Sequence, residues 1–341
     1  MSANSEARIQ MNSLNTPRIK DSLATEDREF YERELASFVP DHVFDAHCHL
    51  YHPDQGKWSG LGFAKSIGYR EHQRLAKQLY PGRLLADLFI HSVWEKTEVA
   101  NEWLAEQVRQ HPTGRGLFLA KPTDDPEWVR QEVRRLGMHG LKCYHVFAQT
   151  EPTWEADIPD YLPERLVRVA DKEGWAITLH VVKSRALADP SNIHWIRHYC
   201  QTYPRMKLIL AHSARGFQPA HNLEGLPKLT GLDNLYFDTS ANCEPIAHQA
   251  ILRIIGHERL LYGTDFPVSL LRGRSVAVAD TFLWLYGDTP VWNEKHKTIR
   301  PTLVGHEHLR SLKWACWSEK LSDKKVEDVF WNNAARLFNV H

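Results

Sequence analysis

The strongest constraint on the fold of this chain is a regular alternation of two kinds of segment along its 341 residues. Short runs rich in apolar and β-branched residues recur, and stretches with helical spacing of apolar residues lie between them. Val129, Val133 and Leu136, for example, fall on one face of a helix. Alternation of this kind predicts parallel strands joined by right-handed helical crossovers. The eight predicted strands are Val43–Leu50, Leu84–Ser92, Gly116–Ala120, Gly140–His145, Trp175–Val182, Lys207–His212, Leu235–Ser240 and Leu260–Thr264.

Eight such units predict a (β/α)8 TIM barrel, an α/β fold in which functional side chains lie at the carboxyl ends of the strands. A doubly wound open sheet is the alternative, and it has less support because no G-x-G-x-x-G motif follows the first predicted strand. We assign residues 41–341 to the barrel domain and expect two helices, from about residue 306 to 338, to pack on the barrel. Residues 1–40 are predicted to form an N-terminal extension and a helix, and residues 270–305 a long capping loop that contains a helix.

Composition limits the partners that such a barrel could have. The 42 basic residues equal the 42 acidic residues, so the net charge gives no reason to expect nucleic acid or an anionic membrane as a partner. The five cysteines form no CxxC pair, which favours a reducing compartment and predicts a cytoplasmic protein. No apolar stretch approaches the ~18 residues of a membrane span. We therefore expect a small-molecule substrate and no membrane or nucleic-acid partner, and we leave open whether the chain forms a homo-oligomer.

The first predicted strand carries two histidines one residue apart, His47 and His49. Side chains alternate between the two faces of a strand, so Asp45, His47 and His49 are predicted to share one face while Cys48 points to the other. Two imidazoles on one face can bind one metal ion. The motif by itself is weak, because 20 histidines in the chain will produce an occasional His-x-His by chance.

Residue types that bind metals also end three later predicted strands. His180 lies near the end of the fifth strand, His212 ends the sixth, and Asp265 follows the eighth. These residues converge on one mouth if the barrel is correct. Imidazoles with one carboxylate suit a first-row divalent ion, Zn²⁺ in the first place and Mn, Fe or Co as alternatives, with a position left for water. The alternative interpretation treats the two histidines as core residues and Asp265 as a helix N-cap.

This set of motifs resembles the amidohydrolase superfamily, specifically its amidohydrolase-2 branch. The resemblance covers about residues 43 to 338, where the Asn-Ala-Ala-Arg-Leu-Phe segment is similar to the closing helix of that branch. The branch includes lactonases, carbon–nitrogen hydrolases and non-oxidative decarboxylases, and it usually keeps one catalytic metal. The resemblance implies that His212 turns towards the metal-bound water or a substrate oxygen. It implies four metal ligands, which are His47, His49, His180 and Asp265.

Lys142 on the fourth predicted strand has two interpretations. It lies where binuclear members of the superfamily carry a carboxylated lysine that bridges two metals. The mononuclear branch also often shows a Gly-x-Lys run here, usually with a histidine two residues after the lysine, whereas His145 of this chain comes three residues after it, on the opposite strand face. Lys142 is therefore either a bridge for a second metal or a partner of the substrate or of a site carboxylate.

The loops after the predicted strands supply candidate substrate-binding residues. Arginines bind carboxylates in a fixed, bidentate geometry, so Arg185, Arg215 and Arg272 indicate an acidic or polyhydroxylated substrate. Trp58 and Trp94 follow the first two strands and are candidates for an apolar or sugar-stacking wall.

The reaction predicted first is metal-dependent hydrolysis of a lactone or another carbon–oxygen or carbon–nitrogen bond in a small molecule. The metal would polarise a carbonyl and activate water, Asp265 would accept the proton of that water and later protonate the leaving group, and His212 would stabilise the oxyanion. The alternative is non-oxidative decarboxylation with the same ligands, and nothing in the motif separates the two. An alternative of another class is a barrel that binds metal or ligand without chemistry.

Overall fold

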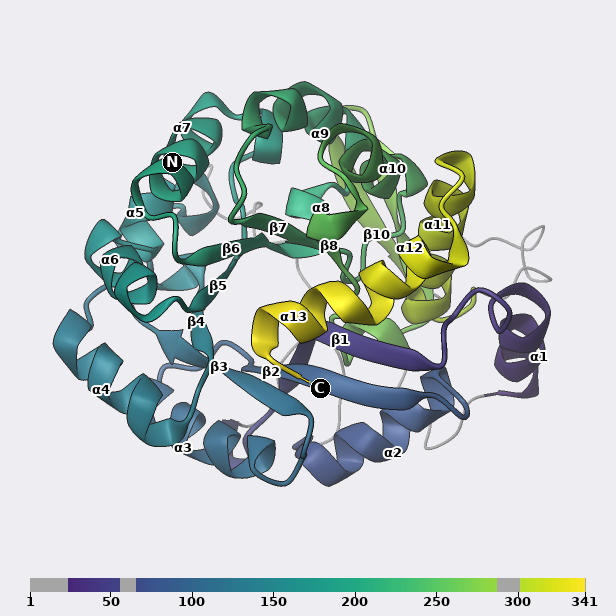
Figure 1. Cartoon of the computed structure of the whole chain (residues 1–341), viewed down its shortest axis with the longest axis horizontal. Helices are drawn as coiled ribbons and strands as arrows, with labels where there is room; N and C mark the ends of the chain where they lie inside the picture. The colour runs from purple at the N-terminus through teal and green to yellow at the C-terminus, as the bar shows by residue number, and fades with distance from the viewer. Residues whose placement is uncertain (1–23, 56–65, 287–300, 341) are drawn as a thin grey trace, which may run out of the picture.

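Eight parallel strands form the centre of the molecule in the computed structural model, which describes residues 24–55, 66–286 and 301–340. The strands follow one another around the barrel in sequence order, with helices outside them (Figure 1). β1 also pairs with the chain after β8, where Ala46 N–H donates to Tyr262 O at 2.8 Å. The (β/α)8 fold and all eight predicted strands are confirmed. The strands are β1 His42–Leu50, β2 Leu84–His91, β3 Gly114–Ala120, β4 Gly140–Cys143, β5 Ala176–Leu179, β6 Lys207–Leu210, β7 Leu235–Asp238 and β8 Leu260–Leu261.

Helices lie between successive strands and cover the outside of the barrel (Figure 1). α4 shows how the sequence sets their ends. The Asp125 carboxylate accepts hydrogen bonds from the first backbone N–H groups of the helix, and Gly137 ends it at a φ of 68°, a conformation that costs glycine little. The helices of this layer are α2 Tyr69–Leu79, α3 Thr97–Val108, α4 Pro126–Leu136, α5 Ile158–Tyr161, α6 Glu164–Glu173, α7 Pro190–Thr202, α9 Pro219–Gly225 and α10 Pro245–Ile254. The short segment α8 (Ala211–Arg215) follows β6 directly and lies inside this layer (Figure 1).

The amino-terminal end of the barrel is closed by α13 (Asn333–Phe338), which crosses the strands in Figure 1. The Phe338 ring stacks on Phe44 of β1 with 5.9 Å between ring centroids. Arg115 Nε donates to Phe338 O at 2.9 Å and fixes the end of the helix to β3. The carboxyl ends of the strands, where a barrel carries its functional groups, therefore lie at the other end of the barrel.

Helices at the two ends of the chain pack beside the barrel (Figure 1). α1 (Thr25–Glu34) agrees with the helix predicted after the N-terminal extension, while residues 1–23 lie outside the described residues. α11 (Val304–Ser318) is the first of the two predicted C-terminal helices. The second runs through α12 (Asp323–Glu327) and a π-helical turn into α13.

The segment after β8 differs from the prediction of a capping loop with a helix. Its described part contains an antiparallel hairpin of β9 (Gly273–Val278) and β10 (Thr281–Tyr286). The sequence signal was present, because β-branched and aromatic residues alternate with other residues on both sides of a two-residue turn. Gly273 has a φ of 137°, and a Cβ there would lie 2.1 Å from Leu285 O, so the hairpin requires glycine at this position. Residues 287–300 of the predicted loop lie outside the described residues.

A buried ion pair joins α1 to the base of this hairpin. Arg272 donates to both carboxylate oxygens of Asp27, whose side chain is 2% exposed. We expect Asp27→Ala to lower the free energy of unfolding by about 3 kcal/mol, because it leaves a partly buried guanidinium without its partner. Urea denaturation measures this. The exposed Arg33–Glu34 pair is the control, and Arg33→Ala should change stability by less than about 0.5 kcal/mol. Equal effects of the two substitutions would contradict the prediction.

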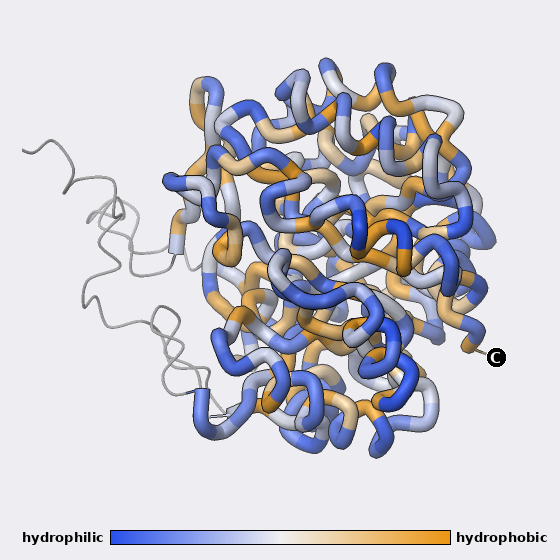
Figure 2. The backbone as a smooth tube through the Cα atoms, turned by 90° about the vertical axis from the view of Figure 1, so that its left-hand side faces the viewer, coloured by the Kyte–Doolittle hydropathy of each residue, from blue (hydrophilic) through white to orange (hydrophobic). Residues whose placement is uncertain are grey.

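Hydrophobic residues are spread along the chain and gather in its interior. Figure 2 shows hydrophilic and hydrophobic segments alternating along the backbone tube. In the ranges that the structure describes, no helix combines the length and the apolar composition needed to cross a membrane.

Candidate metal centre

β1 directs two imidazoles into the carboxyl-terminal mouth of the barrel. His47 Nε2 and His49 Nε2 lie 3.2 Å apart. The pairing of β1 with β2 is irregular between Asp45 and Cys48, and this breaks the alternation on which the prediction for Asp45 depended. The Asp45 carboxylate belongs to a group with Cys48, not to the groups that contain the two imidazoles, and its Oδ1 accepts from the backbone N–H groups of His47 and Thr264 at 3.1 and 2.9 Å. The prediction that Asp45 shares a face with His47 and His49 is therefore wrong.

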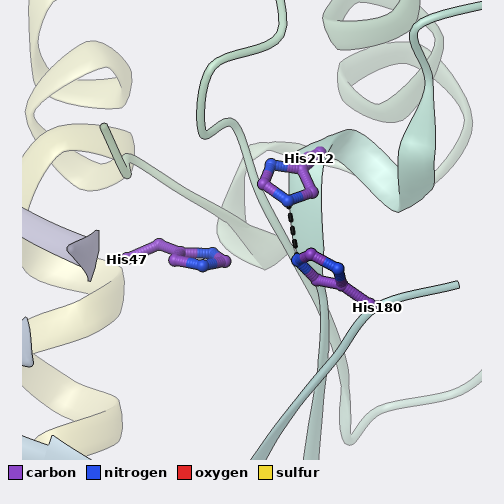
Figure 3. A group of neighbouring side chains, drawn as sticks. All are labelled: His47, His180 and His212. Atoms are coloured by element: carbon purple, nitrogen blue, oxygen red, sulfur yellow. Dashed lines mark hydrogen bonds between the residues drawn. The ribbon is translucent and has the colours of Figure 1, made fainter. Parts of the chain in front are cut away.

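His180 and His212 come from the ends of β5 and β6 and meet the first pair. Their Nε2 atoms lie 2.8 Å apart (Figure 3). Figure 3 shows the His47 ring pointing towards these two imidazoles. The ligand atoms of His47, His180 and His212 all lie within 4.8 Å of one another.

Asp265 completes the cluster from the end of β8. Its Oδ1 lies 3.1 Å from His49 Nε2 and 4.0 Å from His47 Nε2. Its backbone has a φ of 56° and its N–H donates to His47 O at 2.8 Å, so β1 itself holds the carboxylate in place. The structure thus brings together all five residues that the sequence analysis selected: His47, His49, His180, His212 and Asp265.

The hydrogen bonds of these imidazoles fit a bound cation. The Nδ1 atoms of His47 and His212 lie 2.9 Å from acceptors, the Asp238 carboxylate and Ser240 O respectively, so each Nδ1 carries the proton. Their Nε2 atoms then present lone pairs towards the same small volume. Burial, with the nearby Lys142, lowers the pKa of His47 to about 3 and puts the pKa of His180 well below its usual value. Neutral imidazoles with converging lone pairs are the form that binds divalent metals.

Asp238 at the end of β7 is a site residue that the sequence analysis missed. Its carboxylate accepts from His47 Nδ1 at 2.9 Å and from the backbone N–H groups of His212 and Ser240 at 3.0 and 3.1 Å. Burial raises the pKa of this carboxyl, but the neighbouring His47 and His212 imidazoles and the side-chain hydrogen bonds from His47 and Ser240 outweigh burial and hold the pKa below its usual range. Asp238 therefore orients His47 and His212 together. A signal existed, because an aspartate ends the otherwise apolar seventh strand at the same mouth.

His212 begins a left-handed helical turn, in which His212, Ser213, Ala214 and Arg215 all have φ between 53° and 57°. This conformation costs about 1–2 kcal/mol per residue for L-amino acids other than glycine. It brings the first and last residues of the turn, His212 and Arg215, to the mouth of the barrel.

Lys142 lies inside the same cluster. Its side chain is fully buried, and its Nζ is 3.5 Å from His47 Nε2 and 5.0 Å from the centroid of the Tyr144 ring. Burial lowers the pKa of this amine to about 8. His145 lies outside the metal-ligand groups, in a turn where its Nδ1 is 3.2 Å from Thr153 Oγ1.

The three predicted substrate-binding arginines have different environments. Arg185 pairs with Glu224 at 2.6 Å and lies 3.8 Å from Asp280, and Arg272 pairs with Asp27, so acidic partners already occupy these two guanidinium groups. We therefore remove Arg185 and Arg272 from the candidate site. Arg215 makes no ion pair with an acidic side chain of residues 24–55, 66–286 or 301–340, and its Nη1 donates to Val181 O at 3.4 Å.

Aromatic side chains pack on histidines that follow or end β1, β2 and β6. The Trp94 ring stacks on His91 at 5.8 Å and on His52 at 5.1 Å, while Trp58 lies outside the described residues. The Phe217 ring lies 5.5 Å from His212 and packs on Phe282 and Trp284 of β10, at 4.6 and 5.7 Å. We call Phe217, Phe282 and Trp284 the aromatic wall. The aromatic wall was not predicted from the sequence, because residues 270–305 were expected to form a capping loop with a helix and not a hairpin.

The fold and this cluster of four histidines and one carboxylate are those of a metal-dependent TIM-barrel enzyme. The chain matches the Amidohydrolase family model (Amidohydro_2) over residues 44–340. It therefore belongs to the amidohydrolase family, as its motifs predicted.

Among curated proteins, the chain is 27% identical to the gamma-resorcylate decarboxylase of Polaromonas sp., over 51% of this chain and 66% of that protein. Among solved structures, it resembles an amidohydrolase from Staphylococcus aureus with a TM-score of 0.57 and 14% identity, over 88% of this chain and 100% of the other. It also resembles a 5-carboxyvanillate decarboxylase from Novosphingobium aromaticivorans, described with bound manganese and a nitrobenzoic acid, with a TM-score of 0.53 and 12% identity over 87% and 97% of the two chains. At these identities the two structural matches establish the shared fold.

Proposed function

We propose that the protein is a metal-dependent, non-oxidative decarboxylase of a hydroxylated aromatic carboxylic acid. The observation that carries this proposal is the sequence match to gamma-resorcylate decarboxylase. The aromatic wall beside His212 supports it, because an aromatic ring can stack there next to the metal ligands. The match and the aromatic wall together favour decarboxylation over hydrolysis, the reaction that we predicted first from the sequence.

The proposed ligands of one divalent ion are His47, His49, His180 and Asp265. Manganese is the first choice, since the Novosphingobium relative is described with it, and zinc is the second. A bound divalent ion supplies positive charge that holds substrate oxygens and stabilises negative charge on them. The His212 Nε2 faces the same volume and is placed to hold a substrate oxygen.

Asp265 is proposed as the acid. It delivers a proton to the ring carbon that bears the carboxylate, and the carbon–carbon bond then breaks with its electron pair returning to the ring as CO₂ leaves. One proton is taken up in each turnover, and no water is consumed. The aromatic wall orients the ring and keeps water from its face.

Two cationic side chains are proposed to bind the acidic substrate. Lys142 Nζ lies among the ligands and is placed to hold a substrate oxygen. This role needs only one metal, whereas a carboxylated Lys142 would bridge two. Metal analysis distinguishes these two roles of Lys142, because the substrate-binding role predicts about one ion per chain and the bridging role predicts two.

Arg215 is the second cationic candidate, because its guanidinium lies beside the aromatic wall, 5.8 Å from the Phe282 ring centroid. We expect Arg215→Ala to raise KM for the acid about 10-fold or more and to affect kcat less. The reason is that the substitution removes a hydrogen bond between two charged groups, the guanidinium and the substrate carboxylate. Steady-state kinetics measures this. Arg253→Ala is the matched control, because Arg253 pairs with Glu319 on the surface. An unchanged KM in the Arg215 variant would remove this residue from the proposal.

The test of the proposed function is CO₂ release from a panel of dihydroxybenzoates and carboxylated methoxyphenols by manganese-loaded protein. Lactones and amides form the comparison panel, and chelator-treated protein is the blank. We expect metal-dependent CO₂ release from at least one aromatic acid. Turnover of the lactones or amides alone, with no CO₂ from any acid, would support hydrolysis instead.

A further inference from the structure

The left-handed turn at residues 212–215 is held by buried polar side chains from other elements. Asn242 Nδ2, just after β7, donates to His212 O at 3.1 Å. Asn222 Nδ2 of α9 donates to Ser213 O at 2.8 Å, and Ser213 Oγ lies 2.9 Å from His248 Nδ1 of α10. The side chains of Asn222, Asn242 and His248 are fully buried.

These contacts explain how a sequence without glycine can adopt the turn. Glycine normally occupies left-handed positions because it has no Cβ, yet this turn is built from His, Ser, Ala and Arg. The His212 and Ser213 carbonyls accept from the backbone N–H of Gly216 at 3.0 and 3.1 Å, and each accepts a second hydrogen bond from a side-chain amide, of Asn242 and Asn222 respectively. The Asn242 and Asn222 amides therefore stabilise a conformation that the four residues would not adopt alone.

The turn also sets the position of the reacting side chains. His212 has a φ of 57°, so the direction of its Cα–Cβ bond depends on the turn staying left-handed. In that conformation its Nε2 lies 2.8 Å from His180 Nε2 and its Nδ1 2.9 Å from Ser240 O. If the turn relaxed to a right-handed conformation, the imidazole would leave the metal cluster.

We propose that Asn242 is a positioning residue, which holds His212 at the metal centre by stabilising the left-handed turn through the His212 carbonyl. Asn222 stabilises the same turn through its hydrogen bond to the Ser213 carbonyl. The inference rests on the proposed function for its kinetic readout, while its structural readout is independent of any activity.

The test is the series Asn242→Ala, Ala214→Gly and the double variant. Asn242→Ala should lower kcat about 10-fold or more, because His212 no longer holds the substrate oxygen, while metal content stays nearly unchanged because the four proposed metal ligands keep their places. Glycine at position 214 adopts the left-handed conformation without a Cβ clash, so the double variant should recover most of the lost kcat.

Asn234→Ala is the matched control. Asn234 is also a buried asparagine whose amide donates to two backbone carbonyls, Cys200 O and Tyr203 O, at the opposite end of the barrel. It should lower thermal stability and leave kcat unchanged. An unchanged kcat in Asn242→Ala, or no recovery in the double variant, would overturn the proposal.

A crystal structure of Asn242→Ala separates this inference from the proposed function. A relaxed turn with His212 Nε2 displaced from His180 supports the inference even if no aromatic acid is decarboxylated. An unchanged left-handed turn overturns it, whatever reaction the enzyme catalyses.

Discussion

Asp265→Asn should lower kcat at least about 1,000-fold, because Asp265 is both the proposed proton donor and a proposed metal ligand. Asparagine keeps the size of the side chain and tolerates the left-handed backbone at this position, where φ is 56°. The backbone N–H bond to His47 O is unaffected by the substitution. The variant should therefore fold normally and lose turnover. Steady-state kinetics together with circular dichroism measures both.

The control for this experiment is Asp233→Asn, since the Asp233 side chain is 99% exposed. It should retain full activity. A folded Asp265→Asn protein that keeps more than about a tenth of the wild-type kcat would contradict the role of Asp265 as the acid.

His47→Ala should nearly abolish metal binding. His47 belongs to both groups of potential metal ligands at this centre, His47–His180–His212 and His47–His49–Asp265. Its removal also leaves the Asp238 carboxylate without its 2.9 Å donor in a fully buried place. We expect metal affinity to fall at least about 100-fold and activity to fall with it, because even loss of a residue that only orients a ligand costs 10–100-fold.

Elemental analysis of protein dialysed against a weak chelator measures the metal content of this variant. His198→Ala, on the surface of α7, is the control and should keep about one ion per chain. Full metal content and activity in His47→Ala would show that the cluster is not the metal site.

The sequence predicted the barrel and the cluster because both depend on local pattern. Each strand is an apolar run of a few residues, and the ligands end those runs, so the barrel topology brings them together without any further information. His180 and Asp265 were found in this way although they lie far from His47 in the chain. The same rule applied to the seventh strand would have found Asp238.

The features that the sequence did not predict depend on contacts between distant residues or on the sign of a backbone angle. The partner of Arg272 is Asp27, 245 residues away, and no local pattern links the two. The irregular register of β1 moves Asp45 out of the alternation. The left-handed turn after β6 has no glycine to indicate it, so only the structure shows how His212 is held.

The choice between hydrolysis and decarboxylation also lies beyond the motif, because both reactions use the same ligands and the same acid. The difference lies in what reaches the substrate carbon, a proton or a metal-activated water. Asp265→Asn impairs both reactions equally, so it tests the residue and leaves the reaction open.

The most direct test of decarboxylation is the reaction of the preferred aromatic acid in D₂O enriched in ¹⁸O. The proposed chemistry predicts CO₂ in amounts equal to the product, with one deuterium on the ring carbon that carried the carboxylate and no ¹⁸O in the aromatic product. A product that contains ¹⁸O from the solvent, formed without release of CO₂, would contradict it.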